Sequence, residues 1–201
     1  METVLELDKN LFIFLNSLGS ERFDGFWLFI TKQINWIPIF LIIMYLVFKH
    51  LGWRHALMII LVMALLIALT DQTTNLFKNY FQRLRPVNNT DLDDVIHFVH
   101  KRSSFSFISG HASNSMAAAF FLYKVLKPYL KYMGLIFLWP LVFAYSRIYL
   151  GLHYPGDILA GYIWGILMAL LMMKLYTFLR DKYFPEKEEV DHPTNDAPLE
   201  M

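Results

Sequence analysis

Long apolar runs separated by short polar connectors dominate the hydrophobic pattern of this chain. Five runs approach or reach the roughly 20 helical residues needed to cross a bilayer core about 30 Å thick. They cover about 36–48, 55–77, 112–126, 132–150 and 155–179, and the first and third need flanking residues to reach full length. The pattern predicts an all-α fold, a polytopic membrane helix bundle with about five to six transmembrane helices.

Residues 1–33 differ from the rest because polar side chains interrupt their apolar stretches, 5–18 and 23–30. We interpret them as N-terminal amphipathic helices that lie at the membrane interface. A sixth spanning helix is the alternative. The membrane domain is then expected at 34–182. It is followed by a polar tail at 183–201, which its charges and prolines predict to be disordered.

Composition supports a membrane protein and narrows the classes of partner. Of the 201 residues, 56% are hydrophobic and 17% are charged, against about 25% charged in an average soluble domain. The length fits one domain. The net charge of +1 and the lack of a basic face give no indication of nucleic-acid binding. The chain has no cysteine, which excludes disulfides and thiolate metal sites.

The distribution of basic residues predicts an orientation. Lysine and arginine gather in the connectors at 49–55 and 124–131 and from residue 174 onward, and these three places share one side in a five-span topology. The positive-inside rule makes that side cytoplasmic. The opposite side then holds 79–110 and 151–154. The first of these loops is also basic, which conflicts with the rule unless its cations serve a site.

The first of three chemically suggestive clusters is Lys78-x6-Arg85-Pro86. Lys78 and Arg85 are nearly two helical turns apart and would share a face if the helix continued. Pro86 disfavours helix at Arg85, so we expect the chain to turn and present the guanidinium over the membrane surface. The alternative is a basic helix end whose side chains snorkel to the interface.

The second cluster, Ser109-Gly110-His111, comes directly before the apolar helix expected from about Ala112. Serine is a preferred N-cap, and glycine lets an anion approach the backbone. Helix N-termini bind phosphate through their unpaired N–H groups. A capped helix with an incidental histidine is the alternative interpretation.

The third cluster contains Ser146-Arg147, His153 and Asp157 in one short connector. Pro155 suits the first helical position, which would put Asp157 in the first turn of the last helix. From there the carboxylate can orient one ring nitrogen of His153 and leave the other free to attack. The alternative is a turn with a solvated histidine and aspartate.

In order, spacing and residue type, the three clusters resemble the three-part signature of the type 2 phosphatidic acid phosphatase (PAP2) family. The resemblance spans roughly 78–157, and the five-span topology puts all three clusters on one membrane face. Ile108 departs from the pattern, because the family commonly has proline before Ser-Gly-His. That proline shapes the loop and does no chemistry.

The resemblance implies phosphoryl transfer through a phosphohistidine, with no metal and no cofactor. His153 would attack phosphorus while Asp157 orients it. His111 would protonate the leaving lipid oxygen and then help to activate water. The phosphoryl oxygens would be held by the other residues of the signature, which are Lys78, Arg85, Ser109, Gly110 and Arg147.

The expected function is a membrane lipid phosphatase of a bacterial inner membrane, acting on a lipid phosphate or diphosphate at the extracytoplasmic face. Undecaprenyl diphosphate and lipid A are the leading substrates, and phosphatidylglycerolphosphate or phosphatidate is the alternative. A haloperoxidase would be expected to be longer and soluble. A non-enzymatic transporter or scaffold gives no reason for the spacing of His153 and Asp157 beside Arg147.

Overall fold

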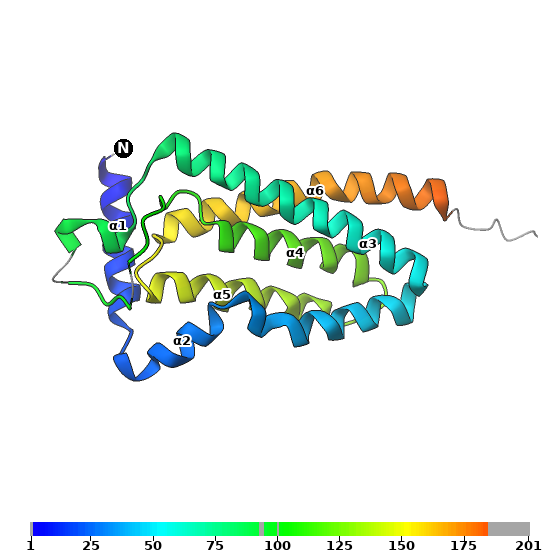
Figure 1. The fold of residues 1–201 in the computed structure, drawn as a ribbon, viewed down its shortest axis with the longest axis horizontal. Helices are drawn as coiled ribbons and strands as arrows, with labels where there is room; N and C mark the ends of the chain where they lie inside the picture. Colours follow the sequence, from blue (N-terminus) through cyan, green and yellow to red (C-terminus); the bar gives the residue numbers. More distant parts are fainter. Residues whose placement is uncertain (1, 93–94, 100, 185–201) are drawn as a thin grey trace, which may run out of the picture.

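A computed structural model describes residues 2–92, 95–99 and 101–184 of the chain. In these ranges the regular structure is helical and contains no strand (Figure 1), so the expected all-α class is confirmed. The predicted tail at 183–201 lies outside the described residues from 185 onward. The six α-helices are α1 (Glu2–Ser17), α2 (Asp24–Ile30), α3 (Ile37–Phe81), α4 (Gly110–Leu126), α5 (Leu138–Tyr149) and α6 (Pro155–Tyr183).

Helix α3 contains two of the predicted apolar runs, joined at a sharp kink. Gly52 has φ 79° and ψ 167°, a backbone conformation open to glycine and rare for other residues. The chain reverses there, and the second half of α3 runs back along the bundle (Figure 1). Short 3₁₀ segments complete the connections: η1 (Glu21–Phe23), η2 (Gln33–Trp36), η3 (Pro86–Asn88), η4 (Thr90–Leu92) and η5 (Met133–Phe137).

Two glycines bring α6 unusually close to α4. A Cβ atom at Gly161 would lie 2.8 Å from the carbonyl oxygen of Ser109, and one at Gly165 would overlap the carbonyl oxygen of Ser113. Small residues four apart on one helix face let two backbones approach closely, as in many membrane helix pairs. Because α4 and α6 each begin at a predicted motif, this contact fixes the two motifs relative to each other.

Many large apolar side chains face outward from the bundle. Leu61 and Leu159 are each 62% exposed, as a surface in contact with lipid would require. The segment Gln33–Leu92 and helix α6 are long and apolar enough to cross a membrane. That test uses length and composition alone, so the five to six spans stay a prediction.

Helix α1 lies across the end of the bundle where α4 and α6 begin (Figure 1). Phe12 is fully buried against the ring of Tyr154, whereas Leu7 and Phe14 remain at least 60% exposed. The amide of Asn16, also fully buried, donates to the carbonyl oxygens of Ile148 and Tyr149 at 3.0 Å each. The helix is therefore amphipathic and anchored to the bundle, while the interfacial position of 1–33 stays a prediction.

Candidate active site

His153 lies in the short connector between α5 and α6, and only 1% of it is exposed. Its Nε2 is 3.1 Å from a terminal nitrogen of Arg85, and its Nδ1 is 3.3 Å from the hydroxyl oxygen of Ser106. The two ring nitrogens therefore face different surroundings. Nε2 faces a cation, and Nδ1 faces a hydroxyl group.

Asp157 occupies the third position of α6, as predicted from Pro155 at the first. Its Oδ2 accepts from the backbone N–H of Tyr154 at 2.9 Å and from the Ser106 hydroxyl, and its Oδ1 accepts from Arg83 at 2.6 Å. The separation between Oδ2 and His153 Nδ1 is 3.6 Å, too long for a normal hydrogen bond. The expected link between carboxylate and imidazole therefore passes through Ser106.

Arg85 points into the protein, contrary to the expectation that its guanidinium lies over the membrane surface. The chain leaves the helix before Arg85, which is extended (φ −71°, ψ 153°) as Pro86 predicts. The guanidinium then donates to the carbonyl oxygens of Ser104 and Leu152, each at 2.7 Å, and is buried. Neutral carbonyl groups hold it in place and leave its charge available to an anion.

The start of α4 lies next to Lys78 on the last turn of α3. Ser109 is the N-cap as predicted, and its hydroxyl accepts from the Ala112 amide at 3.4 Å. Its own amide donates to the carbonyl oxygen of Asp157 at 3.1 Å, which joins α4 to α6. A Cβ atom at Gly110 would be 3.6 Å from Lys78 Nζ, so the ammonium group lies close to the first turn of α4.

Arg147 and His111 complete the set predicted from sequence. Arg147 is 2% exposed and donates to the Thr31 hydroxyl at 2.6 Å, while its Nε is buried with no partner among the described residues. His111, on the first turn of α4, stacks on Phe143 with ring centroids 5.1 Å apart. The structure thus brings all eight predicted side chains or backbone groups to one end of the bundle.

Residues 51–181 match the family model described as the PAP2 superfamily. The chain belongs to that superfamily. It is 35% identical over 170 residues to a lipid A 4'-phosphatase of Bacteroides thetaiotaomicron, covering 82% of this chain and 75% of the relative. A lipid A 4'-phosphatase of Porphyromonas gingivalis is 29% identical, with 91% and 78% covered. An undecaprenyl-diphosphatase of Sulfolobus acidocaldarius is 26% identical, with 87% and 81% covered.

Two solved structures share the fold. A transmembrane PAP2 type phosphatidylglycerolphosphate phosphatase from Bacillus subtilis aligns with a TM-score of 0.69 at 20% identity, over 89% of both chains. LpxE of Aquifex aeolicus aligns with a TM-score of 0.60 at 23% identity, over 84% of this chain and 95% of that one. The expectation of a PAP2-type hydrolase is confirmed, and the family together with the apolar helices indicates a membrane protein.

The electrostatics of this PAP2 site favour an anion. In the described part of the chain, no carboxylate lies within 4 Å of Lys78, Arg85 or Arg147. Burial lowers the pKa of His153 to about 3; Arg85 and Arg147 act in the same direction, and Asp157 opposes them. The imidazole is therefore neutral at pH 7 and keeps a nitrogen lone pair.

Three residues of the network were missed by sequence reasoning. Ser106 bridges His153 and Asp157, and Arg83 joins Asp157 to Asp8 of helix α1 at 2.6 and 2.7 Å. Asp8 also accepts from the Gly156 amide at 2.7 Å. Arg83 and Ser106 lie within a few residues of the predicted motifs along the chain, which indicates a role in the site only weakly. Nothing in the sequence around Asp8 connects it to the site.

Proposed function

We propose that this PAP2 protein removes phosphate from a membrane lipid through a phosphohistidine intermediate on His153. The observation that carries the proposal is the direction of the hydrogen bonds around the ring. The Ser106 hydroxyl donates to Asp157, so its oxygen is free to accept from His153 Nδ1–H. This assigns the lone pair to Nε2, which faces Arg85.

The first step forms a bond between Nε2 of His153 and phosphorus and breaks the bond to the lipid oxygen. His111 gives its proton to that oxygen. Lys78, Arg85 and Arg147 neutralise the charge on the phosphoryl oxygens, together with amide groups at the start of α4. Asp157 stabilises the positive ring of His153 through Ser106.

The second step is hydrolysis of the phosphohistidine. A water molecule attacks phosphorus in line, the bond to Nε2 breaks, and His111 accepts the proton of the water. Phosphate then leaves, and the ring returns to its neutral state. Each of these roles rests on residues of this chain. Within the described ranges, no three histidine, cysteine, aspartate or glutamate side chains lie close enough together to hold a metal ion.

The proposed substrate is lipid A bearing a 4'-phosphate. Support comes from the two lipid A 4'-phosphatases that resemble this chain over most of its length. Undecaprenyl diphosphate is the second candidate, supported by the more distant Sulfolobus relative. The proposed location is a bacterial inner membrane, and the distribution of lysine and arginine supports an orientation with the site at the extracytoplasmic face.

The test is phosphate release by the purified protein from lipid A 4'-phosphate, undecaprenyl diphosphate and phosphatidylglycerolphosphate, with and without chelator. His153→Ala is expected to abolish release while the protein stays folded in detergent. His50→Ala is the matched control, because His50 lies in α3 against Tyr129, which follows the end of α4 opposite to the candidate site. Full activity of His153→Ala contradicts the mechanism.

Two further measurements separate the roles of the histidines. A rapid quench should yield a phosphorylated peptide that contains His153, and its absence during turnover contradicts the covalent step. His111→Ala should lose more activity on lipid substrates than on activated aryl phosphates, whose leaving groups need no proton. Equal losses on both substrates contradict its role as general acid.

A further inference from the structure

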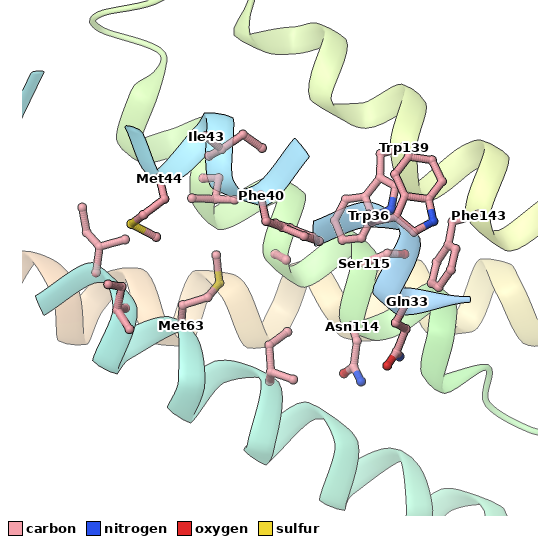
Figure 2. Close-up of a pocket in the computed structure, with 15 residues that line it drawn as sticks. Gln33, Trp36, Phe40, Ile43, Met44, Met63, Asn114, Ser115, Trp139 and Phe143 are labelled. Carbon is pink, nitrogen blue, oxygen red and sulfur yellow. The ribbon is translucent and has the colours of Figure 1, made fainter. Parts of the chain in front are cut away.

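A cavity of about 340 Å³ lies beside the candidate site, between η2, α3, α4 and α5. Figure 2 shows Ile43 and Met44 at one end of it and Asn114, Gln33 and Phe143 at the other. Most of the wall is aliphatic or aromatic. Phe143 also stacks on His111, so the cavity begins next to the residue proposed to protonate the leaving group.

Two buried polar atoms in this wall have no hydrogen-bond partner. Across the described ranges, three buried side-chain atoms are in this condition: Arg147 Nε, Asn114 Oδ1 and Trp139 Nε1. The first belongs to the phosphate site, and the other two belong to residues that line the cavity. Asn114 follows His111 by one helical turn, so both side chains project from the same face of α4.

Buried polar atoms without partners destabilise a protein, and native structures contain few of them. A bound ligand would satisfy these two in a specific way. Asn114 Oδ1 needs a donor, and the indole N–H of Trp139 needs an acceptor. A secondary amide supplies both groups, and an ester carbonyl supplies only the acceptor. A polyprenyl chain supplies neither.

We infer that Asn114 and Trp139 recognise an amide-linked acyl chain on the lipid whose phosphate is removed. This inference rests on the proposed function and names the class of substrate within it: a phosphorylated lipid with an N-acyl group near the phosphate. Such a lipid satisfies both atoms, a diacylglycerol phosphate satisfies one, and a polyprenyl phosphate satisfies neither. The protein is therefore expected to prefer the N-acyl lipid phosphate to the diacylglycerol phosphate, and the diacylglycerol phosphate to the polyprenyl phosphate.

Trp36 provides a matched control within the same cavity. Its indole Nε1 already donates to the carbonyl oxygen of Ile30 at 2.8 Å. Its ring lies 6.0 Å from that of Trp139, so the two tryptophans share the same apolar surroundings. Replacing either with phenylalanine removes a similar volume. Only the change at Trp139 removes an N–H group that lacks a partner among the residues that the structure describes.

The experiment measures kcat/KM for an N-acyl glucosamine-based lipid phosphate and for a polyprenyl monophosphate in the same detergent. The ratio of the two values reports selectivity for the amide and is insensitive to general damage. Asn114→Leu and Trp139→Phe are each expected to lower the ratio about tenfold, mainly through KM, because each removes one hydrogen bond to the substrate. In Trp36→Phe the ratio should stay within about twofold of wild type.

Thermal unfolding in detergent checks that each variant folds. Asn114→Leu removes a buried acceptor that has no partner within 2–92, 95–99 and 101–184, so the unfolding midpoint of this variant should not fall. Should that variant fail to fold, Asn114→Ala takes its place. An unchanged ratio in both the Asn114 and Trp139 variants overturns the inference, as does an equal fall in Trp36→Phe. Wild-type protein that releases phosphate from neither lipid would instead overturn the proposed function.

Discussion

Replacing Ser106 with alanine removes the hydroxyl group that lies between His153 and Asp157. Its oxygen is 3.3 Å from His153 Nδ1, and it donates to Asp157 Oδ2. The direct separation of Nδ1 and Oδ2 is 3.6 Å. In Ser106→Ala the carboxylate keeps Arg83 and the Tyr154 amide, whereas the imidazole loses its connection to the carboxylate.

The size of the effect follows from the bonds that are lost. A hydrogen bond to a charged group contributes about 1.5–3 kcal/mol. In the proposed mechanism, positive charge develops on the ring of His153 as phosphorus is attacked, so this contribution is largest in the transition state. With about 1.4 kcal/mol for each tenfold change in rate, kcat should fall roughly 10- to 150-fold. KM should change less, because Lys78, Arg85 and Arg147 are unaltered.

The assay is the initial rate of phosphate release from the preferred lipid, measured beside thermal unfolding in detergent. Ser113→Ala is the matched control, because its buried hydroxyl donates only along α4, to the carbonyl oxygen of Ser109 at 3.0 Å. The reasoning is refuted if kcat of Ser106→Ala stays within about twofold of wild type. An equal loss of kcat in Ser113→Ala would also refute it.

Three more predictions concern the surroundings of the site. Asp8→Asn leaves Arg83 with one carboxylate partner, so kcat and the unfolding midpoint should both fall. The free energy of unfolding should decrease by about 1–2 kcal/mol. Unchanged kcat and an unchanged midpoint would contradict a role for α1 in the site. Burial lowers the pKa of His153 from 6.5, its ordinary value, to about 3 in the folded protein. As the pH falls, His153 is therefore protonated in the unfolded chain before it is protonated in the folded protein, and the free energy of unfolding should decline below about pH 6.5. Unfolding midpoints of wild type and His153→Gln between pH 7 and 4 test this, since only wild type should show the extra decline. Gly165→Ala should cost about 1–3 kcal/mol by forcing α6 from α4, while Gly134→Ala, with open space around it, should not.

Patterns within short stretches of the sequence predicted most of the helices and the residues at which α4 and α6 begin. The apolar runs anticipated the two halves of α3, and α4, α5 and α6, because each pattern is contained within one helix. Ser109 as N-cap and Pro155 at the first position of α6 were also predicted correctly, since capping depends on a few adjacent residues.

Contacts between distant segments were beyond the reach of those signals. Arg85 turns inward because the carbonyl groups of Ser104 and Leu152 receive it, and they are 19 and 67 residues away. Ser106 replaces the direct contact expected between His153 and Asp157, because the helix cap holds the carboxylate just out of range. Spacing along the chain carries no information about such distances.

The docking of α1 has a consequence for biosynthesis. Asp8 accepts from the amide of Gly156, 148 residues further along the chain. A Cβ atom at Gly156 would lie 2.8 Å from the Asp8 carboxylate, so the two segments approach closely enough to exclude a side chain at residue 156. Helix α1 can therefore take up its position at the end of the bundle only after Gly156, at the start of α6, has been synthesised. Arg83 and Asp157 acquire their final partners only then, so the candidate site stays incomplete in the nascent chain until that point.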